Sequence, residues 1–166
     1  HRLQPRQCGH EGPCAGGDHH AIAGRQVPVQ AQTNILSTTD LKGALTYVNP
    51  DFIDISGFAE DELIGRNHNL VRHPDMPPAA FAHLWQTLKA GRSWMGLVKN
   101  RCKNGDHYWV SAYVTPMRQD GRIVEYQSVR TAASEAQIAA AEALYAELRA
   151  GRENLADAES DARDAF

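Results

Sequence analysis

The sequence predicts an α+β domain built as one antiparallel sheet with short helices on one face. Two observations support this fold class. Residues 33–131 hold segments in the order two strands, three helical stretches and three strands. Turn signals containing glycine separate the strands that follow one another directly, as in antiparallel hairpins. Hydrophobic residues make up 42% of the 166, which is enough for one core between a sheet and the helices that cover it.

The first two strands are expected at Ile35–Thr39 and Leu45–Val48, on either side of the turn Asp40–Gly43. Asn49-Pro50 follows and places an amide at the N-cap and a proline in the first turn of a short helix. That helix is expected to end at Ser56-Gly57.

A second short helix is expected near Glu60–Ile64, where Gly65 ends it. Residues 66–78 are dense in polar groups, and a longer helix follows over Pro78–Lys89. The apolar residues of that helix recur at helical spacing and form one stripe: Phe81, Leu84, Trp85 and Leu88.

Three strands complete the sheet, at Ser93–Arg101, Asp106–Thr115 and Ile123–Thr131. Asn104-Gly105 and Asp120-Gly121 are the hairpin signals between them. In this layout, a cavity between the helices and the sheet is the natural ligand site.

The two ends of the chain differ from this block. Residues 1–32 show no helical or strand period and are interpreted as a flexible leader. The leader's metal-ligating side chains have no zinc-like spacing, so no metal site is expected there; they are Cys8, His10, Cys14, His19 and His20.

Residues 132–166 are expected to form a signalling or linker helix with a frayed end. Ser134 and Gln137 make a capping box at its start. Apolar residues on a 3-4 repeat then form a short seam, which consists of Ile138, Ala141, Tyr145, Leu148 and Leu155. This apolar seam is expected to pack either on the domain's own sheet or on a second chain, so a second copy of the chain is among the expected partners.

The bulk properties narrow the function classes. The net charge of −3 favours no nucleic-acid partner and no anionic membrane surface. No apolar run is long enough to span a bilayer, so no membrane contact is expected of this chain itself, although an anchored parent protein fits equally well. The odd number of cysteines, Cys8, Cys14 and Cys102, favours a reducing cytoplasm.

Four stretches resemble the PAS domain of bacterial aerotaxis receptors: STTDLKGALTYVNPDFIDISGF, NHNLVRHPDMPPAAFAHLWQTLKAG, WMGLVKNRCKNGDHYWV and SVRT. The resemblance covers Asn34–Gly151 and is most specific at Leu70–Pro77. It implies a PAS fold, a five-stranded antiparallel sheet of order 2-1-5-4-3 with short helices. It also implies noncovalently bound FAD and a sensor of redox state or oxygen, as in energy taxis, joined to a downstream signalling domain.

The resemblance also implies a set of cofactor-binding positions: Asn49, Arg72, His73, Asp75, Trp94 and Asn100. Trp94 and Asn100 share one face of an expected strand, because strand residues alternate between faces. That face offers an aromatic wall and an amide for a pyrimidine edge, although an ordinary core strand has the same pattern. Arg72 precedes a helix N-terminus and can hold a pyrophosphate there; a surface pair between Arg72 and Asp75 is equally consistent.

The strand pair also resembles the light-sensing flavin domains of the same superfamily. His68 occupies the position of their reactive cysteine, and without a thiol the flavin–cysteine adduct cannot form there. This favours redox sensing over light sensing. Arg130 matches their flavin-contacting glutamine, which favours Tyr126, Ser128 and Arg130 over Gln127 and Val129 as the inward face of the last strand.

A haem-binding oxygen sensor is one alternative, with His83, His73 and His68 as candidate ligands. His83 lies about 200° from the apolar stripe of its helix and is expected to face solvent. A cofactor-free PAS module that signals through dimerisation is the other alternative. No nucleophile–base pair is recognisable, so catalysis is not expected.

Overall fold

The computed structural model describes residues 24–151. Five strands form one antiparallel sheet in the order β2-β1-β5-β4-β3, so the strand order that the resemblance implied is confirmed. The elements are β1 Ile35–Thr39, β2 Leu45–Val48, α1 Pro50–Ser56, α2 Glu60–Leu63, the 3₁₀ helix η1 His68–Val71, α3 Pro78–Lys89, β3 Trp94–Arg101, β4 His107–Gln119, β5 Arg122–Ala132 and α4 Glu135–Arg149.

The elements expected from the sequence are present, with two differences. The helix η1 lies in the polar segment 66–78, where no element was expected. Strands β4 and β5 also run further than expected, because the turn between them is only two residues long. Asp120 and Gly121 both have positive φ, 52° and 76°, which is the backbone that a tight hairpin with right-handed strand twist requires.

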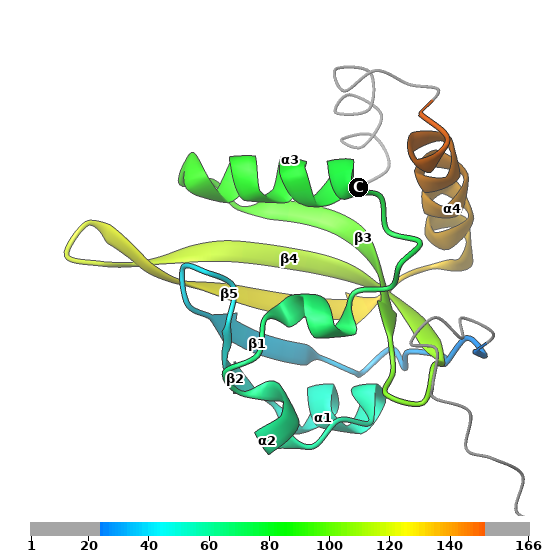
Figure 1. Ribbon diagram of the computed structural model, residues 1–166, viewed down its shortest axis with the longest axis horizontal. Helices are drawn as coiled ribbons and strands as arrows, with labels where there is room; N and C mark the ends of the chain where they lie inside the picture. Colours follow the sequence, from blue (N-terminus) through cyan, green and yellow to red (C-terminus); the bar gives the residue numbers. More distant parts are fainter. Residues whose placement is uncertain (1–23, 152–166) are drawn as a thin grey trace, which may run out of the picture.

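The core lies between one face of the sheet and the helices α1, α2, η1 and α3. Figure 1 shows α3 beside β3 at one end of the sheet and α1 and α2 beside β2 at the other end. Apolar side chains of these helices and of the facing strands are buried there, for example Phe52, Leu63, Leu88 and Val110. Within the described part of the chain, no helix is both long and apolar enough to cross a membrane.

Helix α4 packs on the other face of the sheet. Its start has the expected capping box: Ser134 Oγ accepts from the Gln137 amide at 3.1 Å, and the Ser134 amide donates to Gln137 Oε1 at 2.9 Å. The Tyr145 ring stacks on Trp109, and its hydroxyl donates to the Leu97 carbonyl at 2.7 Å. The described part of the seam therefore uses the domain's own sheet, while Leu155 lies outside the described residues.

The stretch 24–32 differs from the flexible leader expected there. The Val27 amide donates to the His107 carbonyl at 2.7 Å, and the His107 amide donates to the Arg25 carbonyl at 3.0 Å. Val27 and Val29 also pack against the core. Backbone pairing with the start of β4 and apolar contact hold this stretch on the domain. The leader's metal-ligating side chains lie outside the described residues.

The Asn49 side chain makes three hydrogen bonds to backbone groups at the start of α1 and around the start of β1. Its Oδ1 accepts from the Phe52 amide at 3.1 Å, as an N-cap does, and from the Leu36 amide at 3.0 Å. Its Nδ2 donates to the Asn34 carbonyl at 2.7 Å. The side-chain amide is thus committed to joining β1 to α1.

We predict that Asn49→Ala lowers the free energy of unfolding by about 2–3 kcal/mol, because a cap and two further hydrogen bonds are lost. Asn49→Asp keeps both acceptor bonds and should lose much less. Urea unfolding of the two variants measures this difference. Equal stability of the wild type and both variants would contradict the structural role.

Candidate functional site

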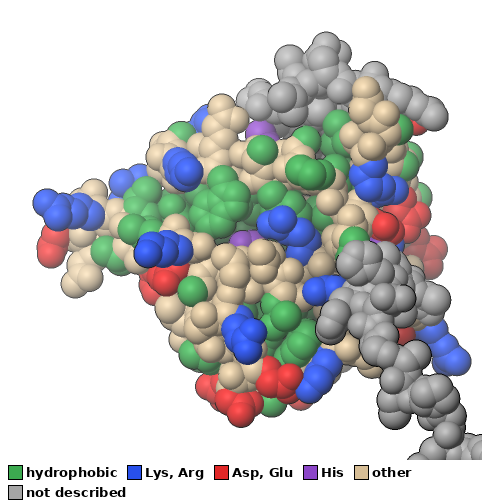
Figure 2. Space-filling model, viewed as in Figure 1, with side chains coloured by type: hydrophobic (Ala, Val, Ile, Leu, Met, Phe, Trp, Pro, Cys, Tyr) green, Lys and Arg blue, Asp and Glu red, His purple; other side chains and the backbone are tan. Residues whose placement is uncertain are grey.

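A cavity opens between the sheet and the helices η1 and α3. The space between these elements is about 610 Å³ when the part open to solvent is included, and about 60 Å³ of it has room for the centres of water-sized molecules. Figure 2 shows hydrophobic side chains reaching the surface below α3, with Lys or Arg side chains beside them. Most of the lining is apolar or aromatic: Val71, Phe81, Leu84, Trp85, Leu88, Trp94, Val98, Ala112, Val114 and Tyr126.

Trp94 and Asn100 line this cavity from strand β3, with exposed fractions of 3% and 4%. The Trp94 indole Nε1 donates to His83 Nδ1 at 2.9 Å. The expectation that His83 faces solvent is therefore wrong. The start of β3 passes along the flank of α3, so the large indole reaches His83 and half-buries it.

Arg72 lines the cavity at its edge. Its backbone pairs with Asn100 in an isolated antiparallel bridge, which sets the loop against the open edge of β3. The guanidinium lies 3.4 Å from the centroid of the Phe81 ring, a cation–π contact. Its Nε is buried and has no hydrogen-bond partner among residues 24–151. The alternative of a surface pair between Arg72 and Asp75 is not what the structure shows.

Strand β5 contributes Tyr126, Ser128 and Arg130 to the cavity, which is the inward face favoured from the sequence. Arg130 is 7% exposed and donates to Ser37 Oγ at 3.0 Å. Ser128 Oγ is buried and lacks a partner within the described residues. The Tyr126 ring meets Trp85 edge-on at 5.6 Å between centroids. This strand therefore adds a cation and a free hydroxyl to an aromatic wall.

His68 lines the cavity from η1. Burial lowers the pKa of His68 to about 4, and the charges of Arg130 and Arg72 act in the same direction. The imidazole is therefore neutral at physiological pH. Of the three candidate haem ligands, His68 lines this cavity, whereas His73 and His83 do not.

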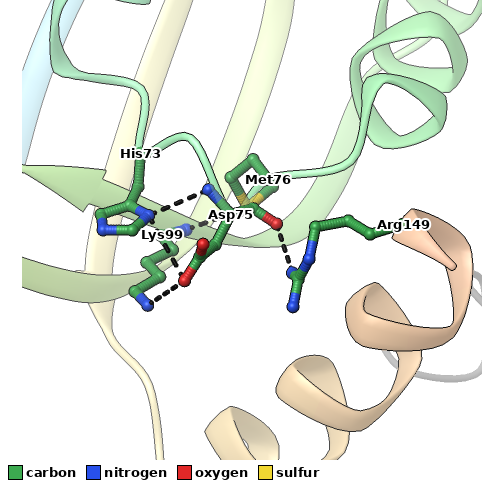
Figure 3. Close-up of polar contacts among 5 residues, drawn as sticks. All are labelled: His73, Asp75, Met76, Lys99 and Arg149. Atoms are coloured by element: carbon green, nitrogen blue, oxygen red, sulfur yellow. Dashed lines mark hydrogen bonds and ion pairs between the residues drawn. The ribbon is translucent and has the colours of Figure 1, made fainter. Parts of the chain in front are cut away.

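His73 and Asp75 lie outside the cavity, in a polar cluster with Lys99 and Arg149 that Figure 3 shows. The Lys99 ammonium is 2.9 Å from the Asp75 carboxylate. The guanidinium of Arg149 in α4 donates to the Asp75 carbonyl. Of the three loop positions expected to bind the cofactor, Arg72 lines the cavity and His73 and Asp75 do not. The chain turns directly after Arg72, where the Met76 amide donates to the His73 carbonyl at 3.0 Å.

His73 is 2% exposed, and its Nδ1 accepts from the Asp75 amide at 3.0 Å. Burial lowers the pKa of His73 to about 4, and the Lys99 charge adds to the effect. The hydrogen bond from Lys99 holds the pKa of Asp75 below its usual value. A neutral imidazole and a charged pair therefore fix this loop beside β3.

Lys99 and Arg149 were not expected from the sequence to take part in the site. Lys99 stands next to Asn100 on the same strand, so the two-residue period of a strand already placed it on the opposite face. Arg149 carries no comparable signal, because a basic residue in the last turn of a helix is common on dipole grounds alone. Its contact depends on where α4 docks.

The chain matches a family model described as the PAS fold over residues 45–130. It is 51% identical over 134 residues to the aerotaxis receptor of Escherichia coli K12, covering 81% of this chain and 26% of the receptor. Two solved structures are similar in fold, each with 25% identity. One is the light state of the blue-light photoreceptor Aureochrome1 LOV, with TM-score 0.58, covering 64% of this chain and 85% of that one. The other comes from a study of a flavin analogue in a light-oxygen-voltage domain, with TM-score 0.60, covering 66% and 84%.

We predict that the domain loses stability as the pH falls from about 6.5 towards 4, because the unfolded chain binds protons there that buried His73 and His68 do not. His73→Asn keeps an acceptor for the Asp75 amide but cannot be protonated. The free energy of unfolding of this variant should therefore fall less steeply over the same pH range. Identical pH dependence of the two proteins in urea titrations would show that His73 is not buried in its neutral form.

Proposed function

The chain belongs to the PAS-fold family, and on that premise we propose that it is a sensor domain that holds FAD and reports redox state or oxygen to a signalling domain of a longer cytoplasmic protein. The observation that carries this proposal is the cavity between the sheet and α3. Its walls are largely apolar and aromatic, and two of its polar atoms, Arg72 Nε and Ser128 Oγ, have no hydrogen-bond partner within residues 24–151. The chain corresponds to 26% of the length of the aerotaxis receptor that it resembles. The downstream signalling domain that would receive the signal is therefore part of the proposal.

The residues present fit a flavin ring. The ring is flat and apolar at one end, and its pyrimidine end carries carbonyl and ring-nitrogen acceptors. The free donors are Arg72 Nε and Ser128 Oγ. A buried donor without a partner costs about 1–3 kcal/mol, so a ligand rich in acceptors would stabilise this cavity.

Each of the six expected cofactor-binding positions has a distinct role in this proposal. Asn100 orients the pyrimidine edge through its amide, and Trp94 provides a wall for the ring. Arg72, at the mouth, reaches the pyrophosphate. His73 and Asp75 act indirectly, because they hold the loop that carries Arg72, and Asn49 holds β1 to α1. Bound FAD supplies reversible electron transfer; the chain orients it and keeps water away.

Redox sensing is favoured over light sensing because the cavity lining, as formed by residues 24–151, contains no cysteine. His68 lines the cavity where the light-sensing domains carry a cysteine. The described cysteine, Cys102, lies beyond the lining, and its thiol donates to the Ile55 carbonyl at 3.2 Å. Burial raises the pKa of Cys102 to about 11, so it is a poor nucleophile.

Two connections lead from the cavity to α4. Strand β5 carries Arg130 in the cavity and runs directly into Ser134, where α4 begins. The second connection is the cluster of Figure 3, because Lys99 is the neighbour of Asn100 on β3 and binds the loop that Arg149 also contacts. Both ends of α4 are thus tied to elements that line the cavity.

We predict that the purified protein is yellow and has flavin absorption bands. Asn100→Ala should weaken the binding free energy of the flavin by about 1–3 kcal/mol, because the ring edge loses its hydrogen-bonding amide. Asn104→Ala, in the exposed turn after β3, is the matched control and should keep its flavin. A Soret band would instead support haem on His68. A colourless wild-type protein would favour an interaction module without a cofactor.

We further predict that reduction of the flavin changes amide hydrogen exchange across residues 123–148, because the flavin can shift α4 only by interacting differently in its two states. Arg149→Gln removes the contact with the Asp75 carbonyl and should shrink the difference at the end of α4. Exchange measured on oxidised and dithionite-reduced protein tests this. If residues 123–148 exchange identically in both states, the signal does not leave through α4.

A further inference from the structure

Arg130 is a cation buried without an anion. Its contacts are the Ser37 hydroxyl at 3.0 Å and the face of the Phe52 ring at 5.4 Å. The residues that line the cavity include no aspartate or glutamate, and the ion pairs of residues 24–151 do not include Arg130. The Arg130 side chain lines the cavity, and the hydrogen bond that its guanidinium makes within residues 24–151 is the one to Ser37.

The other ionisable groups around the cavity do not supply a negative charge. They are Arg72 in the loop after η1, His68 of η1, Tyr108 of β4 and Tyr126 of β5. Burial raises the pKa of Tyr108 to about 12, so this phenol is neutral near pH 7. Helix α3 and strands β1 and β3 line the cavity with uncharged side chains. The cavity thus holds two cations and no anion.

A buried unpaired charge is costly, because water no longer solvates it. Burial lowers the pKa of Arg130, yet a guanidinium is not deprotonated in proteins. The group that relieves this cost is a ligand that brings negative charge into the cavity. A carboxylate side chain placed beside Arg130 would neutralise its charge, and the cavity would then have no preference for a negatively charged ligand.

From this geometry we infer that Arg130 makes the cavity selective for the negatively charged reduced form of the bound ring and so raises its midpoint potential. The inference rests on the proposed function. When the ring takes two electrons from an external reductant and one proton from water, it gains one negative charge. A fixed cation in a site of low dielectric stabilises that form more than the neutral oxidised ring.

The first test compares midpoint potentials of wild type, Arg130→Gln and Arg122→Gln, each titrated anaerobically with dithionite and a reference dye. Arg122 is exposed at the start of the same strand, so its variant removes an equal charge away from the cavity. Arg130→Gln should weaken binding of the reduced relative to the oxidised ring at least tenfold, which lowers the potential by about 30 mV for two electrons. Arg122→Gln should match the wild type. Equal potentials in all three proteins overturn the inference.

The second test uses only the wild-type protein, so it still tests the role of Arg130 if Arg130→Gln fails to fold or loses its flavin. It measures how the wild-type potential depends on pH, from about pH 5 to about pH 8, beside free FAD. His68 and Tyr108 keep one charge state over that range, because their pKa values are about 4 and about 12. If Arg130 holds the reduced ring as an anion, reduction takes up one proton per two electrons, and the midpoint potential changes by about 30 mV per pH unit. In the protein, this slope should persist to a lower pH than in free FAD.

The outcomes separate the two proposals. A pH dependence identical to that of free FAD, in protein that does contain flavin, overturns the role of Arg130 and leaves the flavin site standing. Wild-type protein that binds no flavin overturns both. A shallower pH dependence than that of free FAD at the acidic end supports both.

Discussion

Strand β3 faces two different partners, and the two-residue period of a strand assigns its side chains between them. Trp94, Val98 and Asn100 line the cavity. Between them, the Leu97 carbonyl accepts from Tyr145 of α4, and Lys99 holds the loop that α4 also contacts. A shift of register by one residue would exchange these faces. The site and its connection to α4 therefore both depend on the pairing of β3 with β4.

The free edge of β3 is where the loop between η1 and α3 docks. The His73 amide donates to the Lys99 carbonyl at 3.2 Å, and Arg101 Nε donates to the Leu70 carbonyl at 3.1 Å. These contacts cover an edge that would otherwise expose unpaired backbone groups. They also place Arg72 at the cavity and Asp75 outside it. One loop thereby supplies a cavity residue and an anchor for α4, and with Arg130 it gives the cavity its positive charge.

The fold was predictable from the sequence, because its signals are local. Asn49-Pro50, Asn104-Gly105 and Asp120-Gly121 mark boundaries through backbone conformation alone, and the resemblance supplied the strand order. The inward positions of Trp94 and Asn100 followed from strand period. The placement of His73 and Asp75 did not, because an irregular loop has no period that assigns its side chains to faces. The hydrogen bond from Trp94 to His83 could not be predicted from the sequence either, because it depends on how β3 passes α3.

The proposed place of the flavin ring is the cavity between the sheet and α3, and the three tryptophans report on it. Trp85 and Trp94 line the cavity, whereas Trp109 stacks on Tyr145 at the opposite face of the sheet. Fluorine NMR of protein labelled with 5-fluorotryptophan, recorded with and without FAD, reports on each indole. If the ring lies in the cavity, the resonances of Trp85 and Trp94 move on binding and that of Trp109 moves little. Bound FAD that shifts Trp109 and leaves the two cavity indoles unchanged would contradict it.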